Sequence, residues 1–102
     1  MQLQKNVKEF AQNNKLQNSP EVCALDLVSE VGEVAKEILK ATNYGKKKFN
    51  SPEEMKYELG DAFYSLLALA NSCNVDLEEA LNAVLEKYGK RMAKGGAGSE
   101  FE

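Results

Sequence analysis

Two pairs of carboxylates in the sequence have a spacing suited to metal chemistry. Glu30 and Glu33 form one pair, in "LVSEVGEVAKEILK", and Glu58 and Asp61 form the other, in "YELGDAFYSLLALA". A separation of three residues places both members of a pair on one face of a helix. Like charges at this spacing repel each other, and no lysine or arginine stands within either pair. Carboxylates from facing helices suit Mg²⁺ or Mn²⁺, so we predict that these four residues form a divalent-metal site.

Asp26 and Glu37 extend the first pair into an acidic stripe along the same helix face. Together with Glu30 and Glu33 they fall within an arc of about 60° at 100° per residue. We expect Asp26 and Glu37 to support the metal ligands from an outer position. The alternative is a solvated acidic face, which is common for charges at this spacing. The second acidic pair, on another helix, favours the metal site.

The elements that carry these pairs are predicted to be helices, because no segment alternates with the period of a strand. The predicted helices cover residues 2–16, 20–42, 52–73 and 77–92. Their start signals are Ser19 before Pro20, Ser51 before Pro52, and Asp76 with Glu79. Gly45 favours the end of the second helix. The fold class is therefore all-α, and the short connections predict antiparallel neighbours.

Apolar residues lie next to both acidic pairs on their helices. We expect the apolar faces of the second and third helices to pack together and to bring their acidic edges close to each other. The run from Phe63 to Ala70 is apolar almost all round, as in a helix that is buried on more than one side. A chain this short buries little surface by itself. We therefore predict a four-helix bundle that is completed by homo-oligomerisation.

Composition limits the other classes of function. The length of 102 residues predicts one domain, residues 1–94. Residues 95–102 are predicted to be a flexible tail, and its last residues match those that common cloning sites encode. A net charge of −3 argues against a nucleic-acid partner, and no apolar run is long enough for a membrane span. The absence of histidine excludes His-based triads and nearly all zinc sites.

Cys23 and Cys73 lack a paired spacing, so we predict two buried thiols and a cytoplasmic location.

The two acidic motifs and the later segment "CNVDLEEALNAVLEKYGKR" together resemble the MazG-like, all-α nucleoside triphosphate pyrophosphohydrolases. The resemblance covers about residues 18–92, and it is greatest to the small, single-domain dCTP-pyrophosphatase type. It implies Mg²⁺-dependent hydrolysis of a (deoxy)nucleoside triphosphate to the monophosphate and pyrophosphate. It also implies a preference for dNTPs such as dCTP and a house-cleaning role in the nucleotide pool. It further implies a homo-oligomer, with a tetramer favoured over a dimer.

The resemblance assigns roles to the four carboxylates. Glu30, Glu33, Glu58 and Asp61 stand at the positions of the family signature E-x-x-E, a spacer, and E-x-x-D. All four are expected metal ligands. One glutamate would also act as the base toward the attacking water, and we expect Glu33 or Glu30 in this role.

Substrate contacts are implied less directly. Lys87 and Arg91 match the K-x-x-x-R pattern of the family and are candidate phosphate contacts, although basic residues near a helix C-terminus are also favoured by the macrodipole. Leu85 replaces an asparagine that is often found in this pattern. Asn18 stands where dCTP-type relatives have a histidine, so it is the candidate base contact. Lys40 replaces an aromatic residue, which leaves the wall that stacks on the base unidentified.

Two other functions fit the same sequence. A phosphoribosyl-ATP pyrophosphatase-like enzyme also needs clustered carboxylates, so only substrate assays separate it from the first reading. A non-catalytic helical interaction module would keep the fold but show no metal dependence and no pyrophosphate release. Thermal melting with and without Mg²⁺ or Mn²⁺ discriminates between the module and the enzymes, because a metal that binds only the folded state raises the melting temperature.

Overall fold

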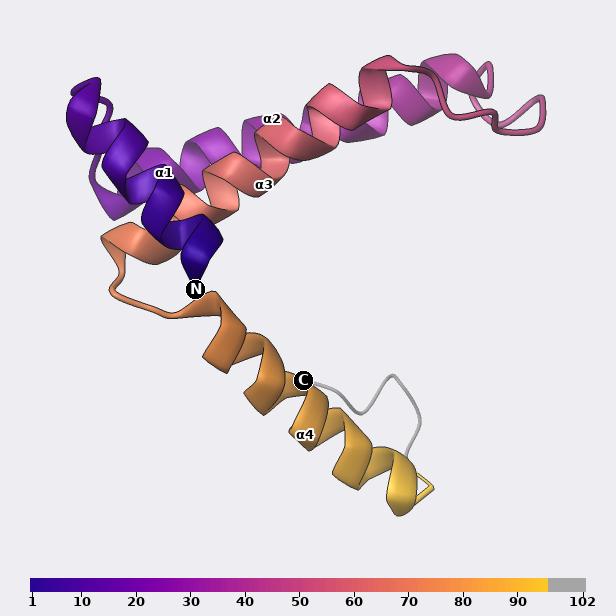
Figure 1. Cartoon of the computed structure of the whole chain (residues 1–102). Coiled ribbons are helices and arrows are strands. Elements are labelled where there is room, and N and C mark those ends of the chain that lie inside the picture. Colours follow the sequence, from indigo (N-terminus) through magenta and orange to yellow (C-terminus); the bar gives the residue numbers. More distant parts are fainter. Residues whose placement is uncertain (96–102) are drawn as a thin grey trace.

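Four helices make up the regular structure of the chain within the described residues (Figure 1). The computed structural model describes residues 1–95. The helices are α1 (Gln2–Asn13), α2 (Pro20–Ala41), α3 (Glu54–Ser72) and α4 (Leu77–Ala93). The predicted all-α fold class with four helices is therefore confirmed. Of the predicted flexible tail, residues 96–102 lie outside the described residues.

The ends of α2 follow the predicted signals. Ser19 has an extended backbone, and its hydroxyl accepts a hydrogen bond from the Val22 amide at 3.4 Å, while Pro20 occupies the first helical position. Beyond the helix, Asn43, Tyr44 and Gly45 have φ values of 48°, 58° and 85°. A helix cannot continue through left-handed residues, so α2 stops where the sequence predicted.

The predicted start of α3 at Ser51 is wrong. The helix begins at Glu54, and Glu53 precedes it without a side-chain cap. The Met55 amide donates to the Pro52 carbonyl at 3.1 Å, so Pro52 belongs to a separate turn with three-residue spacing. Similarly, α1 ends at Asn13 and not at residue 16, because the chain turns at Lys15 with φ of 54°. Of the three predicted caps, those at Ser19 and Asp76 form and the one at Ser51 does not.

In α4 the cap is Asp76, whose Oδ1 accepts a hydrogen bond from the Glu79 amide at 2.9 Å. The second carboxylate oxygen of Asp76 lies 3.0 Å from the amino group of Met1. These two donors lower the pKa of Asp76, the Glu79 amide having the larger effect. The start of α4 is thus tied to the start of α1.

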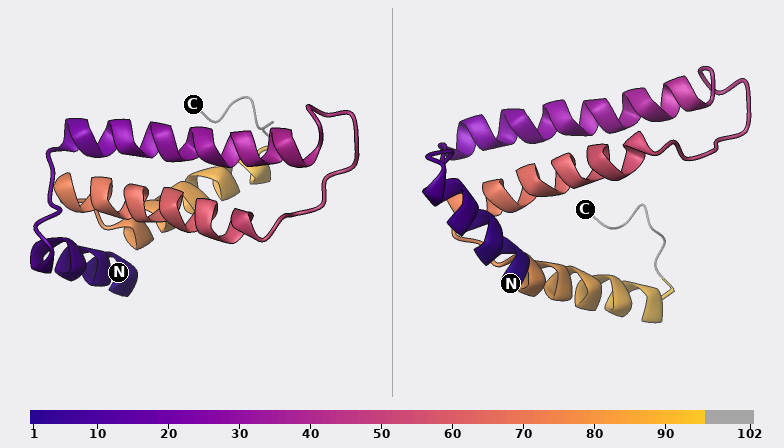
Figure 2. Two further views of the ribbon diagram at one scale, coloured as in Figure 1. Left: turned by 90° about the horizontal axis from the view of Figure 1, so that it is seen from above. Right: turned by 45° about the horizontal axis from the view of Figure 1, so that its top comes forward.

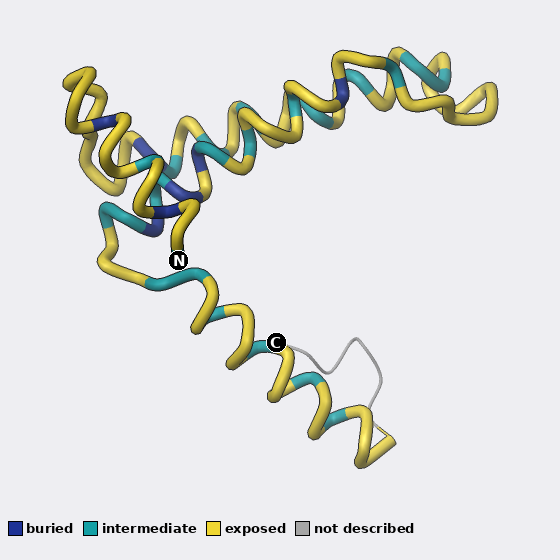
Figure 3. The backbone as a smooth tube through the Cα atoms, viewed as in Figure 1, coloured by how far each residue is buried: buried dark blue, intermediate teal, exposed yellow. Residues whose placement is uncertain are grey.

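The helices α2 and α3 form an antiparallel hairpin (Figures 1 and 2). The helix α1 packs across α3 near the end of α3 that leads to α4, away from the loop between α2 and α3. Most of the buried residues gather where these three helices meet (Figure 3). The buried apolar side chains are Ala11, Cys23, Met55, Leu67 and Ala70. The core is therefore small and lies at one end of the hairpin.

A buried amide joins three helices at this junction. The Gln4 side chain is 7% exposed; its Nε2 donates to Asn71 Oδ1 at 3.2 Å and to the Val75 carbonyl at 2.8 Å. Its Oε1 accepts from the Leu77 amide at 2.6 Å. Asn71 Nδ2 returns a bond to the Gln4 carbonyl at 3.0 Å. Gln4 therefore links α1 to the end of α3 and the beginning of α4.

The helix α4 diverges from the hairpin, so the chain has the shape of an open V (Figures 1 and 2). None of its residues is buried. The radius of gyration is 16.7 Å, whereas a compact domain of this length has about 13 Å. Within one chain the four helices do not close into a bundle.

The predicted packing of apolar faces in the hairpin needs correction. Besides the buried Cys23, the half-buried positions of α2 recur every three or four residues and mark the face toward α3; they are Ala24, Leu27, Glu30, Val34, Glu37 and Ala41. Glu58 is half-buried in the corresponding face of α3. By contrast, Val28 of α2 is 70% exposed and Phe63 of α3 is 41% exposed. Acidic residues therefore lie in the contact between the helices, and much of the apolar surface stays uncovered.

Two further predictions concern the cysteines and the membrane. Cys23 is buried and Cys73 is exposed, and both thiols are free. The prediction of two buried thiols is therefore wrong for Cys73, which ends α3 at the surface. Among the described helices, none combines the length and the apolar character that a membrane span requires.

Candidate active site

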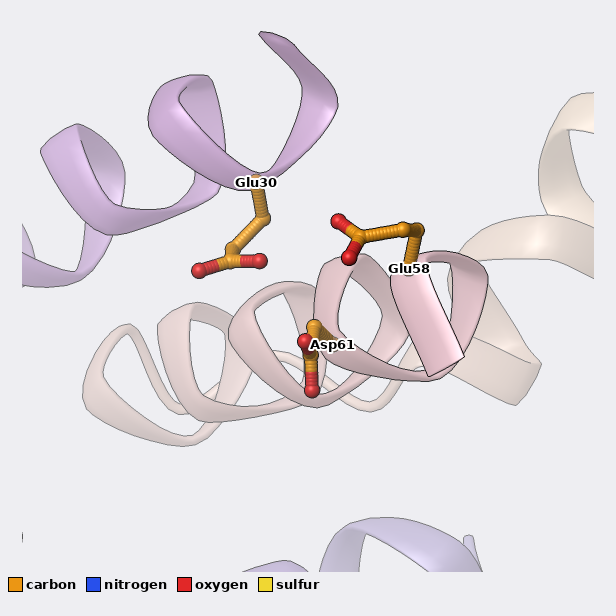
Figure 4. Close-up of side chains that lie close together, drawn as sticks. All are labelled: Glu30, Glu58 and Asp61. Atoms are coloured by element: carbon orange, nitrogen blue, oxygen red, sulfur yellow. The ribbon is translucent and has the colours of Figure 1, made fainter. Parts of the chain in front are cut away.

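Three of the four predicted metal ligands converge between α2 and α3 (Figure 4). One carboxylate oxygen from each of Glu30, Glu58 and Asp61 lies within 4.8 Å of the others. Glu30 comes from α2, and Glu58 and Asp61 come from α3. The sequence motifs are separated by a long loop, and the hairpin brings them to the same level.

Helix packing explains why these carboxylates meet. Glu30 and Glu58 stand in the stripes through which the two helices contact each other, so their side chains point into a shared space. Asp61 follows Glu58 by three residues, which turns it about 60° toward one side of the hairpin. It is exposed, whereas Glu30 and Glu58 are half-buried. The cluster therefore opens to solvent on the side of Asp61.

Several negatively charged groups lie close together in the cluster. Partial burial and the nearby charges of Glu33, Asp61, Glu30 and Glu37, in that order, raise the pKa of Glu58 above its ordinary value. Within residues 1–95, no lysine or arginine forms an ion pair with Glu30, Glu58 or Asp61. The packing of the hairpin thus concentrates negative charge without a neutralising side chain.

Glu33 lies next to the cluster but outside its tightest group. Its carboxylate raises the pKa of Glu58 more than any other charge does, which places it near Glu58 across the two helices. Glu33 is exposed and is not one of the three residues that meet within 4.8 Å. The sequence predicted that Glu33 lies near the other carboxylates, but not that it is more exposed than Glu30 and outside the tight group.

The two predicted supporting residues differ from each other. Glu37 is half-buried in the stripe that faces α3, and it pairs with Lys40 at 3.6 Å. Both residues line an open cavity of about 290 Å³ together with Pro52 and Glu54. Asp26 is exposed, one turn before Glu30. Sequence reasoning did not select Lys40 as a site residue, although its spacing from Glu37 is typical of a helix ion pair.

The candidate substrate contacts lie away from the carboxylates within one chain. Lys87 and Arg91 belong to α4, the arm that diverges from the hairpin (Figure 1). The Lys87 ammonium lies 5.5 Å from the centre of the Tyr88 ring. Asn18 precedes α2 and lines a cavity of about 90 Å³ near Cys23. Ten helical residues between Pro20 and Glu30 correspond to about 15 Å, so Asn18 is remote from the cluster.

The fold and the site define a class of protein: an all-α protein in which a helical hairpin presents clustered carboxylates that have no basic partner within residues 1–95. A model of the MazG nucleotide pyrophosphohydrolase domain matches residues 18–95. The chain therefore belongs to the MazG nucleotide pyrophosphohydrolase domain family. The predicted family and the predicted enzyme class, a nucleotide pyrophosphohydrolase, are both confirmed.

Similar proteins from Bacillus support this assignment. The chain is 37% identical over 76 residues to the protein YpjD of Bacillus subtilis (strain 168), covering 72% of this chain and 67% of YpjD. It is similar to the crystal structure of a Bacillus-conserved MazG protein, a nucleotide pyrophosphohydrolase, with 32% identity, a TM-score of 0.71 and 85% of each chain covered. It is also similar to the crystal structure of the putative pyrophosphatase YpjD from Bacillus subtilis, with 33% identity, a TM-score of 0.72, and 87% of this chain and 91% of that chain covered.

Proposed function

We propose that the protein hydrolyses nucleoside triphosphates, with a preference for dNTPs such as dCTP, to the monophosphate and pyrophosphate in a Mg²⁺-dependent reaction. The observation that carries this proposal is the meeting of Glu30, Glu58 and Asp61 within 4.8 Å without a basic partner among the described residues. A house-cleaning role and a cytoplasmic location belong to the same proposal, and the two free thiols support the latter.

The donor set fits a hard divalent cation. Ligand oxygens of a Mg²⁺ ion lie at most about 4.2 Å apart, because each is about 2.1 Å from the metal. The three carboxylates are within about 0.6 Å of this limit, which a change of side-chain rotamer provides. When bound, the ion supplies positive charge against the triphosphate and lowers the pKa of a coordinated water. Mn²⁺ fits the same oxygen donors.

Glu33 is the best-placed base. It is exposed beside Glu58 but outside the tight group, so its carboxylate is available to accept a proton from water. The water oxygen bonds to the α-phosphorus, the bond from the α-phosphorus to the bridging oxygen breaks, and pyrophosphate leaves. General bases contribute about 10²- to 10⁴-fold to such rates. Glu30 is half-buried in the metal-binding group, so we place it with the ligands.

The phosphate contacts Lys87 and Arg91 and the base contact Asn18 stay part of the proposal. Because α4 diverges from the hairpin, Lys87 and Arg91 reach a substrate only if α4 moves or if another copy presents them. A homo-oligomer, with a tetramer favoured over a dimer, is therefore part of the proposal as well. The open shape of the single chain supports it.

The experiment is a pyrophosphate-release assay over a panel of ribo- and deoxynucleoside triphosphates with Mg²⁺, Mn²⁺ or EDTA. Glu58→Gln should lower turnover by at least about 100-fold and remove the rise in melting temperature that Mg²⁺ causes. Glu33→Gln should lower turnover similarly but keep most of that rise. Glu21→Gln, an exposed glutamate at the start of α2, is the control and should match the wild type. Full activity of Glu58→Gln, or activity in EDTA, would refute the proposal.

A further inference from the structure

A second group of polar side chains gathers where α1 meets the turn between α3 and α4 (Figures 1 and 2). These side chains line a cavity of about 340 Å³ that is open to solvent. Lys5 and Lys8 line it from α1, and Asn71, Asn74 and Asp76 line it from the end of α3 and the turn. Its volume falls within the range of cavities that hold small ligands, about 300–1,000 Å³.

The two lysines of this cavity have no anionic partner. Within residues 1–95 neither Lys5 nor Lys8 forms an ion pair, although Glu9 stands four residues after Lys5. The carboxylate of Asp76 lines the same cavity, but its charge is already balanced by the amino group of Met1 at 3.0 Å. Two positive charges therefore stay uncompensated on one wall of the cavity.

The opposite wall adds a hydrogen-bond donor that is not used within the chain. The Asn71 amide donates to the Gln4 carbonyl at 3.0 Å, so it is occupied. The side chain of Asn74, by contrast, forms no hydrogen bond among the described residues. The backbone of Asn74 has a left-handed φ of 57°, and its amide donates to the Asn71 carbonyl at 3.3 Å. The cavity thus offers three donors, two of them charged, to a ligand.

This cavity is separate from the carboxylate cluster. Ten residues of α3 separate Asp61 from Asn71, which corresponds to about 15 Å along the helix. Salt screens charges beyond about 8 Å at physiological ionic strength, so the acidic cluster has little effect on an anion bound near Asn71. The two regions also differ in charge, and their ligands differ accordingly.

We propose that this cavity binds a phosphate group, carried by free pyrophosphate or by a nucleotide. A phosphate monoester carries a charge of about −1.5 to −2 and three acceptor oxygens. It therefore matches both the two lysine charges and the three donors of Lys5, Lys8 and Asn74. A bound phosphate group joins α1 to the turn before α4. It adds to the hydrogen bonds that Gln4 makes there and restrains the direction of α4.

An NMR titration in EDTA tests this site, because the acidic cluster repels phosphates when no divalent cation is present. The probes are pyrophosphate and an α,β-methylene nucleoside triphosphate at constant ionic strength. The side-chain amide signals of Asn74 should shift and saturate with a dissociation constant on the order of 1 mM. A lower constant for the nucleotide would identify a nucleotide as the source of the phosphate group. An equal or lower constant for pyrophosphate would identify free pyrophosphate.

Lys5→Gln and Lys8→Gln should each raise the dissociation constant about tenfold, because each removes one charge-assisted hydrogen bond. Lys15→Gln is the matched control, since Lys15 is exposed just after α1 and does not line the cavity. It makes the same change in net charge and should bind both probes like the wild type. Equal weakening by all three substitutions, shifts confined to α4 near Lys87, or shifts that never saturate would overturn the proposal.

Hydrogen exchange of the wild type gives a second readout that needs no variant. The backbone amides of Val75 and Leu77 should exchange several-fold more slowly with saturating pyrophosphate, because a ligand that binds only the closed state opposes local opening. Unchanged exchange at both amides would also overturn the proposal. Both experiments are carried out in EDTA and use no turnover, so a failure here is distinct from a failure of the proposed activity.

Discussion

The Gln4 amide offers the sharpest test of how the helices are held together. Replacing Gln4 by Met keeps a similar volume and helix propensity but removes both the donor and the acceptor. The Val75 carbonyl, the Leu77 amide and the Asn71 side chain then lose a partner. Groups left without a partner cost about 1–3 kcal/mol each when buried. These three are only partly buried, so we take the lower value and expect a loss of about 3 kcal/mol.

Urea unfolding at one fixed protein concentration measures this loss. A change of about 3 kcal/mol is a large part of the stability of a small domain and corresponds to about 12–24 °C in melting temperature. Gln2→Met is the matched control, because Gln2 is exposed on the same helix and bonds only to Asn6 among the described side chains. It should change stability by less than about 0.5 kcal/mol. Equal effects of the two substitutions would refute the role of Gln4.

Two further predictions concern the site and the helix starts. The raised pKa of Glu58, caused first by burial and then by Glu33, means that protonation favours the folded state. This contribution is full below the ordinary value of 4.5 and is lost as pH rises through the folded pKa. The rise in melting temperature caused by Mg²⁺ should become larger as pH rises, because the metal and the proton compete for the carboxylate. Melting curves in EDTA and in Mg²⁺ across this range should therefore diverge as pH rises. A metal effect independent of pH would contradict the assignment of Glu58 as a metal ligand. At the helix starts, Ser19→Ala should cost about 0.5–1 kcal/mol because it removes the α2 cap, whereas Ser51→Ala should cost almost nothing, since α3 begins at Glu54. Urea unfolding compares the two, and an equal loss would restore Ser51 as a cap.

Local chemistry determined most of what was predictable from the sequence. Pro20 after Ser19 set the start of α2, and Gly45 set its end, because these residues act on the backbone at their own positions. The spacing of Glu30 and Glu58 within their motifs marked them as candidate ligands, and the structure brings both into one cluster with Asp61. Spacing along a helix depends only on helix geometry, so it survives any arrangement of the helices.

Tertiary structure decided which side of each helix is covered. An amphipathic pattern does not reveal whether an apolar face packs within the chain or against another molecule, and Phe63, which begins the run expected to be buried on more than one side, is exposed in the single chain. The role of Gln4 had no local signal, because its partners are at least 67 residues away in the chain. The direction of α4, and with it the distance of Lys87 from the carboxylates, depends on these contacts between distant segments. Such contacts arise only when three helices meet, and no periodicity within one helix encodes them.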